Sequence, residues 1–168
     1  GSLGESRPRA CWGACFANQQ PYYYDIYALR HPEWSPDDCW KFEQALRDAG
    51  IPHVLAREKA VYSRQKKINA NSTWIEVQSA FGGFGIYDVK YLANVAYRSR
   101  DSKGEIMCEH VNFNEDIRAN GAKLFINPAL INSRNNPHTS NRRPLNRFKW
   151  LIKIFLSNIS SKFANKSI

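Results

Sequence analysis

Residues 108–128 read CEHVNFNEDIRANGAKLFINP and contain the two kinds of element from which the fold is built. The first part, residues 109–120, predicts a helix, and Gly121 stands where a glycine commonly ends one. The second part, Lys123 to Leu130, is mostly apolar and predicts a strand that Pro128 stops.

Elements of the same two kinds alternate along the preceding residues. Strands are predicted at 11–17, at Tyr22–Leu29 and at Trp74–Ala80, where apolar and polar residues alternate in the last of them. Residues 54–68 look helical or partly irregular, and residues 101–104 predict a turn. Alternating strands and helices indicate an α/β layer structure.

The best-marked helix of the sequence covers residues 35–50. Ser35 can cap its start, Pro36 fits the first helical position, and acidic residues follow at the positive end of the helix dipole. Gly50 is expected to end it.

The charge of the chain is concentrated in its last third. The net charge is +9, yet all 15 acidic residues lie at or before Asp116, and ten Lys or Arg residues follow it. Residues 147–163 predict a basic amphipathic helix, with aromatic and aliphatic residues on one face and lysines opposite. We expect this segment, within a tail at 141–168, either to lie on an anionic membrane surface or to pack on protein.

The sequence argues against a zinc site, a membrane-spanning segment and a nucleic-acid partner. The four cysteines lack zinc-ligand spacing, which predicts reduced and mostly buried thiols, and no apolar run is long enough to span a membrane. The basic residues are not interleaved with exposed aromatics across a sheet, so we expect no nucleic-acid partner. The expected location is cytoplasmic, with peripheral binding to the inner face of the cell membrane through the tail as an option.

Three stretches in a fixed order carry a resemblance to a known family. They are Tyr22–His31, Ser79–Tyr87, and Cys108–Phe113 followed by Gly121–Pro128, and the stretch PEWSPDDCW at 32–40 joins the first two. Together they resemble bacterial glycosyltransferase-like proteins of the GT-A fold, over roughly residues 11–140. The resemblance implies that residues 1–140 are the acceptor-side, C-terminal part of such a domain, a partial mixed sheet flanked by helices.

What the resemblance implies is sugar transfer from a nucleotide sugar to a glycan acceptor such as a surface polysaccharide. Folds of this type place an Asp-x-Asp motif for a divalent Mn or Mg ion and the diphosphate before this region, and the sequence contains none. Because the only methionine is Met107, we expect a shortened chain or part of a longer one. The cation is then expected only if the other half is supplied. His138, in a polar loop, is either a late metal ligand or a solvated histidine.

Glu109 is the expected catalytic base. Glycosyl transfer passes through an oxocarbenium-like state, and a carboxylate can accept the proton of the acceptor hydroxyl. Glu109 opens the helix at 109–120, whose positive end stabilises its charge, and His110 is expected as a nearby polar contact. The alternative is a glutamate that only satisfies the helix dipole.

Substrate contacts are expected from two of the stretches. In the resembling fold, the bend at Phe81, Gly82 and Gly83 lines a sugar pocket; the alternative is a tight turn that needs positive φ. Asp25 can contact sugar hydroxyls, with Tyr22, Tyr24 or Trp34 stacking on the sugar ring, or it can face solvent on its strand. The enzymatic assignment requires Glu109 and the glycine bend to face one cleft.

Two further alternatives arise from the missing motif. The chain can be a non-catalytic remnant or a membrane-associated interaction module. A sheet that lacks its first strands leaves an unpaired edge, so we also expect self-association.

Overall fold

The structure is a computed structural model that describes residues 12–134. These residues belong to the first of two units into which the chain divides, Gly1–Arg134 and Asn135–Ile168. The helix predicted at 147–163 and His138 lie outside the described residues.

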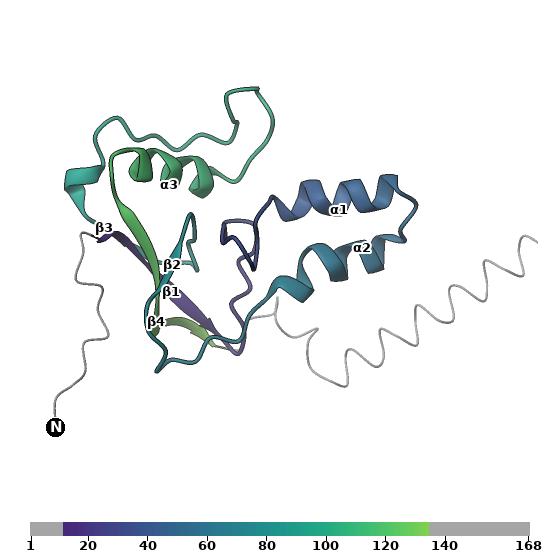
Figure 1. Ribbon diagram of the computed structural model, residues 1–168, viewed down its shortest axis with the longest axis horizontal. Helices are drawn as coiled ribbons and strands as arrows, with labels where there is room; N and C mark the ends of the chain where they lie inside the picture. The colour runs from purple at the N-terminus through teal and green to yellow at the C-terminus, as the bar shows by residue number, and fades with distance from the viewer. Residues whose placement is uncertain (1–11, 135–168) are drawn as a thin grey trace, which may run out of the picture. The chain divides into compact units, whose positions relative to one another are not determined.

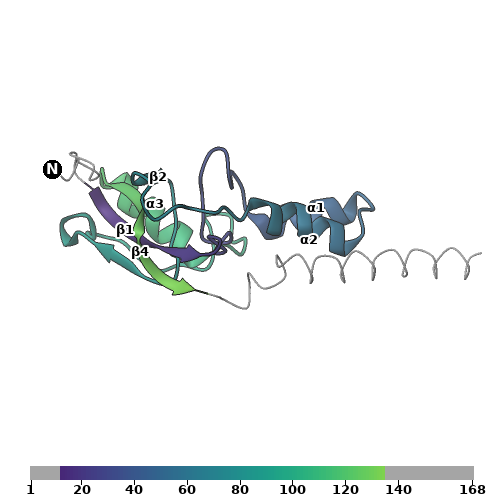
Figure 2. The same cartoon turned by 90° about the horizontal axis from the view of Figure 1, so that it is seen from below.

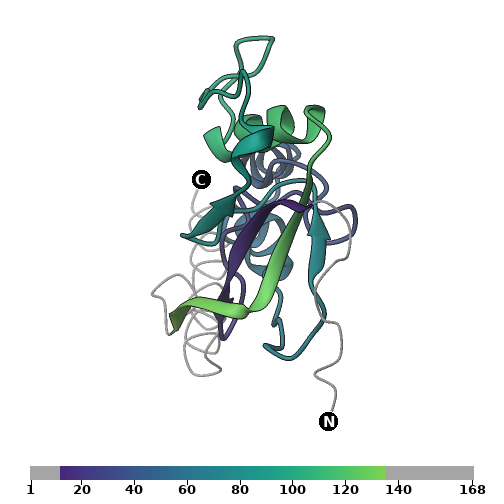
Figure 3. The same ribbon diagram turned by 90° about the vertical axis from the view of Figure 1, so that its left-hand side faces the viewer.

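A four-stranded mixed sheet forms the centre of the first unit. Its two long strands, β1 (Trp12–Gln20) and β4 (Lys123–Arg134), are parallel and lie in the middle of the sheet. The short strands β2 (Ile75–Val77) and β3 (Gly85–Tyr87) are antiparallel to β4 and β1 respectively. The order is therefore β2-β4-β1-β3, which Figure 3 shows with the purple β1 and the green β4 side by side.

Three α-helices accompany the sheet in the described residues. α3 (Glu109–Ala119) lies beside the sheet, whereas α1 (Cys39–Asp48) and α2 (His53–Ala60) pack on each other and extend away from it (Figures 1 and 2). Short 3₁₀ turns follow at η1 (Tyr62–Arg64) and η2 (Val89–Tyr91). The predicted α/β class is confirmed at this level: a mixed sheet with helices.

The hydrophobic core lies between the sheet and the segments that cover it. Phe16 of β1 and Leu124 and Ile126 of β4 are almost wholly buried, and Ile117 of α3 and Tyr23 pack with them. Complete burial of each large side chain stabilises the fold by about 1.5–3 kcal/mol relative to exposure.

The helix predicted at 35–50 is present, with a different start. It begins at Cys39, and Asp38 caps it: Oδ1 accepts the backbone N–H groups of Trp40 (2.8 Å) and Lys41 (3.2 Å). Ser35 was therefore wrong as the cap; it is buried in a bridge with His31. Gly50 follows the helix with φ +82°, as predicted.

The strand predicted at Tyr22–Leu29 is wrong. This segment forms turns, because the side chain of the buried Gln19 takes the place of a neighbouring strand: its Oε1 accepts the backbone N–H groups of Tyr24 (3.0 Å) and Asp25 (3.3 Å). Aromatic content favours a strand, but a local hydrogen-bond acceptor decides the conformation here.

The prediction that Pro128 stops its strand is also wrong. β4 continues to Arg134 because the pairing with β1 shifts register after Asn127, so the ladder needs no N–H from proline. The buried Asn18 donates from Nδ2 to the carbonyl of Pro128 (2.9 Å) and holds the irregular point together. Residues 131–134, which lie beyond the predicted end of this strand at Leu130, are therefore strand as well.

The other predicted elements are close to those observed. Residues 12–17 belong to β1, residues 54–68 contain η1 and all of α2 but its first residue, and residues 101–104 form a turn with Gly104 at φ +78°. The strand predicted at Trp74–Ala80 shortens to Ile75–Val77. Gly121 ends α3 with φ +90°.

The three cysteines of the described part, Cys15, Cys39 and Cys108, are free and buried, as expected. None of the helices in residues 12–134 combines the length and apolar character needed to cross a membrane.

A long loop passes over α3 and is tied to it by one stripe of the helix. Three side chains at successive four-residue spacing hold it: Asn112 donates to the carbonyls of Arg98 and Arg100, Asp116 pairs with Arg98, and Asn120 donates to the carbonyls of Tyr91 and Ala93. Figures 1 and 3 show this loop between η2 and the start of α3. We call residues 91–108 the α3 strap.

Candidate functional site

The turn after β1 brings Asp25 against the glycine bend. Gly82 donates its backbone N–H to Asp25 Oδ2 (3.2 Å), and the backbone N–H of Ala28 also donates to this carboxylate. Asp25 therefore lies in a turn and ties two backbone segments together, and it is not the solvent-facing strand residue of the alternative prediction.

The bend at Phe81-Gly82-Gly83 packs closely against β1 and β4. Gly82 and Gly83 have φ +67° and +81°, a region that favours glycine. A Cβ on Gly82 would lie 2.2 Å from the carbonyl oxygen of Ala17, and one on Gly83 2.6 Å from Asn132 Nδ2. Positive φ favours glycine at both positions, and the contact with the Ala17 backbone adds to it at Gly82, so the fold accounts for both without a ligand.

Phe81 connects the bend to the start of α3. Its ring stacks on the imidazole of His110, with ring centroids 3.8 Å apart and 15° between planes. Its backbone N–H donates to the hydroxyl of the buried Tyr23 (3.3 Å). Tyr97 of the α3 strap meets the imidazole edge-on, with its ring centroid 5.6 Å from that of His110.

Asn114 holds the other side of this junction. Its Nδ2 donates to Ser79 Oγ (2.9 Å) and to the carbonyl of Ala80 (3.0 Å), and all three residues are buried. The segment that leads into the bend is therefore fixed to α3 by side-chain hydrogen bonds as well as by ring stacking.

Glu109 lies at the exposed edge of this cluster. Its side chain is 50% exposed, and its Oε1 is 4.0 Å from His110 Nε2, whose side chain is only 16% exposed. No side chain caps α3 at Cys108, so Glu109 is the first acidic group at the positive end of the helix.

Burial shifts the titration of the groups behind Glu109. It raises the pKa of Asp25 above the usual value of 3.8, although the N–H of Gly82 counteracts it. Burial also lowers the pKa of His110 below 6.5, although Glu109 and Asp25 oppose this shift. It raises the pKa of the Cys108 thiol to about 11, so this thiol stays protonated near neutral pH.

His110 is therefore neutral near pH 7. Its Nδ1 is buried and has no hydrogen-bond partner among the described residues. A neutral imidazole carries no positive charge that could pair with the carboxylate of Glu109.

The structure thus brings together most of the expected site residues. Asp25, Phe81, Gly82, Glu109 and His110 form one cluster, which we call the α3-start cluster. Gly83 adjoins it through the bend.

Trp34 is not part of this cluster. Its ring stacks on His31, with centroids 4.4 Å apart, and it packs against the main core. The described contacts of Trp34 do not include Asp25 or Glu109, so stacking on a sugar bound at the α3-start cluster finds no support for this residue.

Sequence reasoning missed the residues that position the cluster. Gln19 shapes the turn around Asp25, and Tyr23 and Asn114 anchor the backbone at Phe81 and Ala80. Tyr23 and Asn114 are buried polar groups whose partners lie far away in the sequence, so no local pattern marks them, whereas Gln19 acts locally on Tyr24 and Asp25. Within residues 12–134, no group of three or more His, Cys, Asp or Glu side chains could hold a metal ion.

Comparison of the chain with protein-family models, with curated proteins and with solved structures found no match.

Proposed function

We propose that this chain is the acceptor-side part of a GT-A-type glycosyltransferase, with Glu109 as the base that activates the acceptor hydroxyl. The observation that carries the proposal is the position of Glu109: a half-exposed carboxylate at the start of α3, beside the stacked rings of Phe81 and His110. A carboxylate next to aromatic side chains suits a sugar, because the faces of a sugar ring are apolar and its rim carries hydroxyls.

In the proposed reaction, the acceptor hydroxyl oxygen forms a bond to the anomeric carbon of the donor sugar while the bond from that carbon to the phosphate oxygen breaks. The electron pair of the broken bond leaves with the nucleoside diphosphate, and the hydroxyl proton passes to Glu109. Because Glu109 is exposed, an acceptor can reach it from solvent.

The residues behind Glu109 hold the site in shape. Asp25 fixes the backbone at Gly82, and the stack of Phe81 on His110 fixes the bend to α3. Neutral His110 leaves Glu109 free to accept a proton. Asp25 itself is less suited as the base, because backbone N–H groups already occupy its carboxylate.

Donor binding is assigned to residues other than those described. The residues of 12–134 do not fit a divalent ion that would hold a diphosphate, so we derive no step through one. A nucleotide sugar and a Mn or Mg ion belong to this proposal only in an enzyme that includes a nucleotide-binding half.

The first test is the coding sequence upstream of Gly1. An in-frame segment that ends in Asp-x-Asp supports the enzyme, whereas a stop codon with no partner gene supports a non-catalytic remnant.

The second test replaces the proposed base in the enzyme that includes this segment. Glu109→Gln keeps the shape of the side chain and removes its basicity, so we expect kcat for sugar transfer to fall about 10²- to 10⁴-fold. Glu115→Gln is the matched control, because Glu115 is also an exposed glutamate of α3. A Glu109→Gln enzyme that transfers sugar at the normal rate would end the assignment.

A membrane-associated module is the alternative that the basic tail favours. The sequence of residues 147–163, which lie outside the described residues, predicts a helix with an apolar face and lysines opposite it. We expect the chain to sediment with vesicles containing phosphatidylserine and to be released by salt. Equal sedimentation with neutral phosphatidylcholine vesicles would argue against electrostatic tethering.

A further inference from the structure

A hollow lies at the opposite end of α3 from the α3-start cluster. It has a volume of about 500 Å³ and lies between the end of α3, the start of β4 and the edge strand β2. Arg118, which lines it, is nine residues beyond Glu109, or about 14 Å along the helix axis. The two sites are therefore separate, and a ligand bound in this hollow is independent of the proposed glycosyltransferase function.

The floor of this hollow is apolar. Val77 of β2 and Ala122 and Leu124 at the start of β4 line it, and all three are buried. Gly121, which has no side chain, and the small Ala122 leave open space beside α3. Such a floor suits the apolar body of a small ligand.

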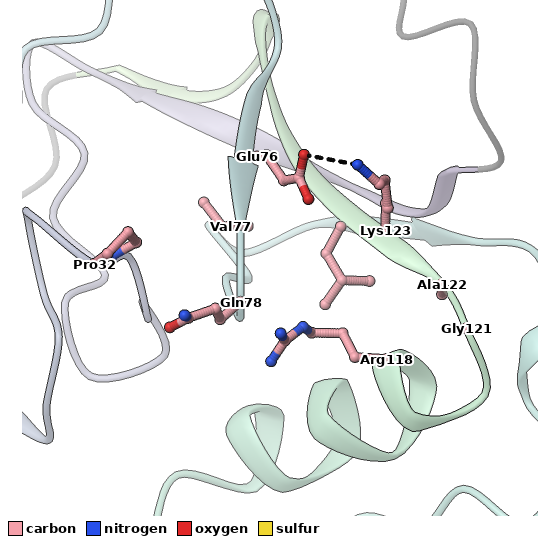
Figure 4. Close-up of a pocket in the computed structure, with 9 residues that line it drawn as sticks. Pro32, Glu76, Val77, Gln78, Arg118, Gly121, Ala122 and Lys123 are labelled. Atoms are coloured by element: carbon pink, nitrogen blue, oxygen red, sulfur yellow. Dashed lines mark hydrogen bonds and ion pairs between the residues drawn. The ribbon is translucent and has the colours of Figure 1, made fainter.

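The guanidinium of Arg118 is the uncompensated charge of the hollow. Figure 4 shows it extending from α3 toward β2, on the side where Gln78 lies. Arg118 forms no ion pair with any described residue. Glu76, the carboxylate that lines the hollow, is already 3.3 Å from Lys123 Nζ.

Arg118 is not needed to cap its own helix. The last carbonyl groups of α3 already accept backbone N–H groups: Gly121 donates to the carbonyl of Arg118 (2.9 Å) and Ala122 to that of Ile117 (3.3 Å). Its side chain is therefore available to a ligand.

We propose that this hollow binds a small carboxylate with an apolar body. The Arg118 guanidinium receives the carboxylate through two parallel hydrogen bonds, and the floor of Val77 and Leu124 receives the body. With Arg118 and Lys123 against Glu76, the lining charge is positive, which favours an anion over a neutral ligand.

The test uses benzoate as the probe on the full chain. Isotope-labelled protein is titrated with sodium benzoate while NMR follows the Arg118 Nε–H resonance and the methyl groups of Val77 and Leu124. We expect saturable shifts with a Kd in the range of about 1 mM, and at least about tenfold weaker binding for Arg118→Gln. Arg118→Lys keeps the charge but not the fork, and should fall between the two.

Arg47→Gln is the matched control, because Arg47 is an exposed arginine in the last turn of α1 and does not line the hollow. This variant should bind benzoate like the wild type. Benzyl alcohol, the neutral analogue, should bind at least about tenfold more weakly than benzoate. Equal affinity of Arg118→Gln and wild type, equal affinity for benzyl alcohol, or the same shifts with sodium chloride would overturn the proposal.

Discussion

At the scale of single residues, two glycines with similar backbone angles have different surroundings. Gly50 (φ +82°) has nothing within 4 Å of the place where a Cβ would lie. At Gly82 (φ +67°), the same atom would lie 2.2 Å from the carbonyl oxygen of Ala17. At both positions the positive φ disfavours any L residue other than glycine. Only at Gly82 would a side chain also clash with another segment, because the bend lies against β1.

Alanine substitutions separate these two effects. We expect Gly50→Ala to lower the free energy of unfolding by about 1 kcal/mol, the cost of a side chain at positive φ. Gly82→Ala should lower it by about 3 kcal/mol or more, because overpacking against backbone adds to this cost. Urea denaturation followed by tryptophan fluorescence measures both. Equal losses would show that contact with Ala17 does not matter.

At the scale of elements, α3 organises the molecule through different faces. Ile117 faces the core, whereas the stripe of Asn112, Asp116 and Asn120 holds the α3 strap. The strap in turn carries Tyr97 to the edge of His110. The start of α3 is therefore shaped by contacts along the whole helix.

Removal of the Arg98–Asp116 pair should loosen the strap without unfolding the protein. The guanidinium of Arg98 contacts both carboxylate oxygens of Asp116, at 2.7 and 2.8 Å. Since Arg98 is 47% exposed, we expect Asp116→Ala to cost no more than about 1 kcal/mol of global stability. Amide hydrogen exchange should nevertheless speed up in residues 96–100 and stay unchanged in α1.

Glu115→Gln is the control for this experiment, because Glu115 is the neighbouring exposed acid of α3. If amide exchange in the α3 strap of the Asp116→Ala variant is unchanged, the hydrogen bonds of Asn112 and Asn120 are enough to hold the strap.

The contribution of the Arg98–Asp116 pair to stability also depends on pH. Arg98 holds the pKa of Asp116 below 3.8, so its contribution is complete above pH 3.8 and is lost as the pH falls further.

At the scale of the whole molecule, one edge of the sheet is open among the described residues. The β3–β1 bonds run from Ala17 to Phe84 and from Asp88 to Gly13, so the antiparallel alternation turns the backbone groups of Gly85 and Tyr87 away from β1. Ile86 on this strand is 45% exposed. An apolar edge of this kind can pair with another strand.

We propose that two copies of the chain associate through β3. A lysine on an edge strand opposes such pairing, so Ile86→Lys should weaken self-association at least about tenfold in analytical ultracentrifugation. Ile106→Lys is the control, because Ile106 is 65% exposed but lies outside the four strands. A wild-type chain that stays monomeric at high concentration would contradict the proposal.

The sequence by itself determined the elements whose signals are local. Gly50, Gly104 and Gly121 end helices or turns where expected, because positive φ is a property of the glycine itself. The stretch that starts α3 was likewise found from its order of residues, together with Glu109 and His110.

Only the tertiary structure decided where partners distant in the sequence were involved. β4 passes Pro128 because the distant strand β1 shifts register beside it. The turns at Tyr22–Leu29 are instead set by the nearby side chain of Gln19. Asp25 joins Gly82 across 57 residues. Trp34, by contrast, stacks on the nearby His31 and not on the α3-start cluster. Such contacts depend on which segments the fold packs together, and a periodic pattern along the chain does not encode that choice.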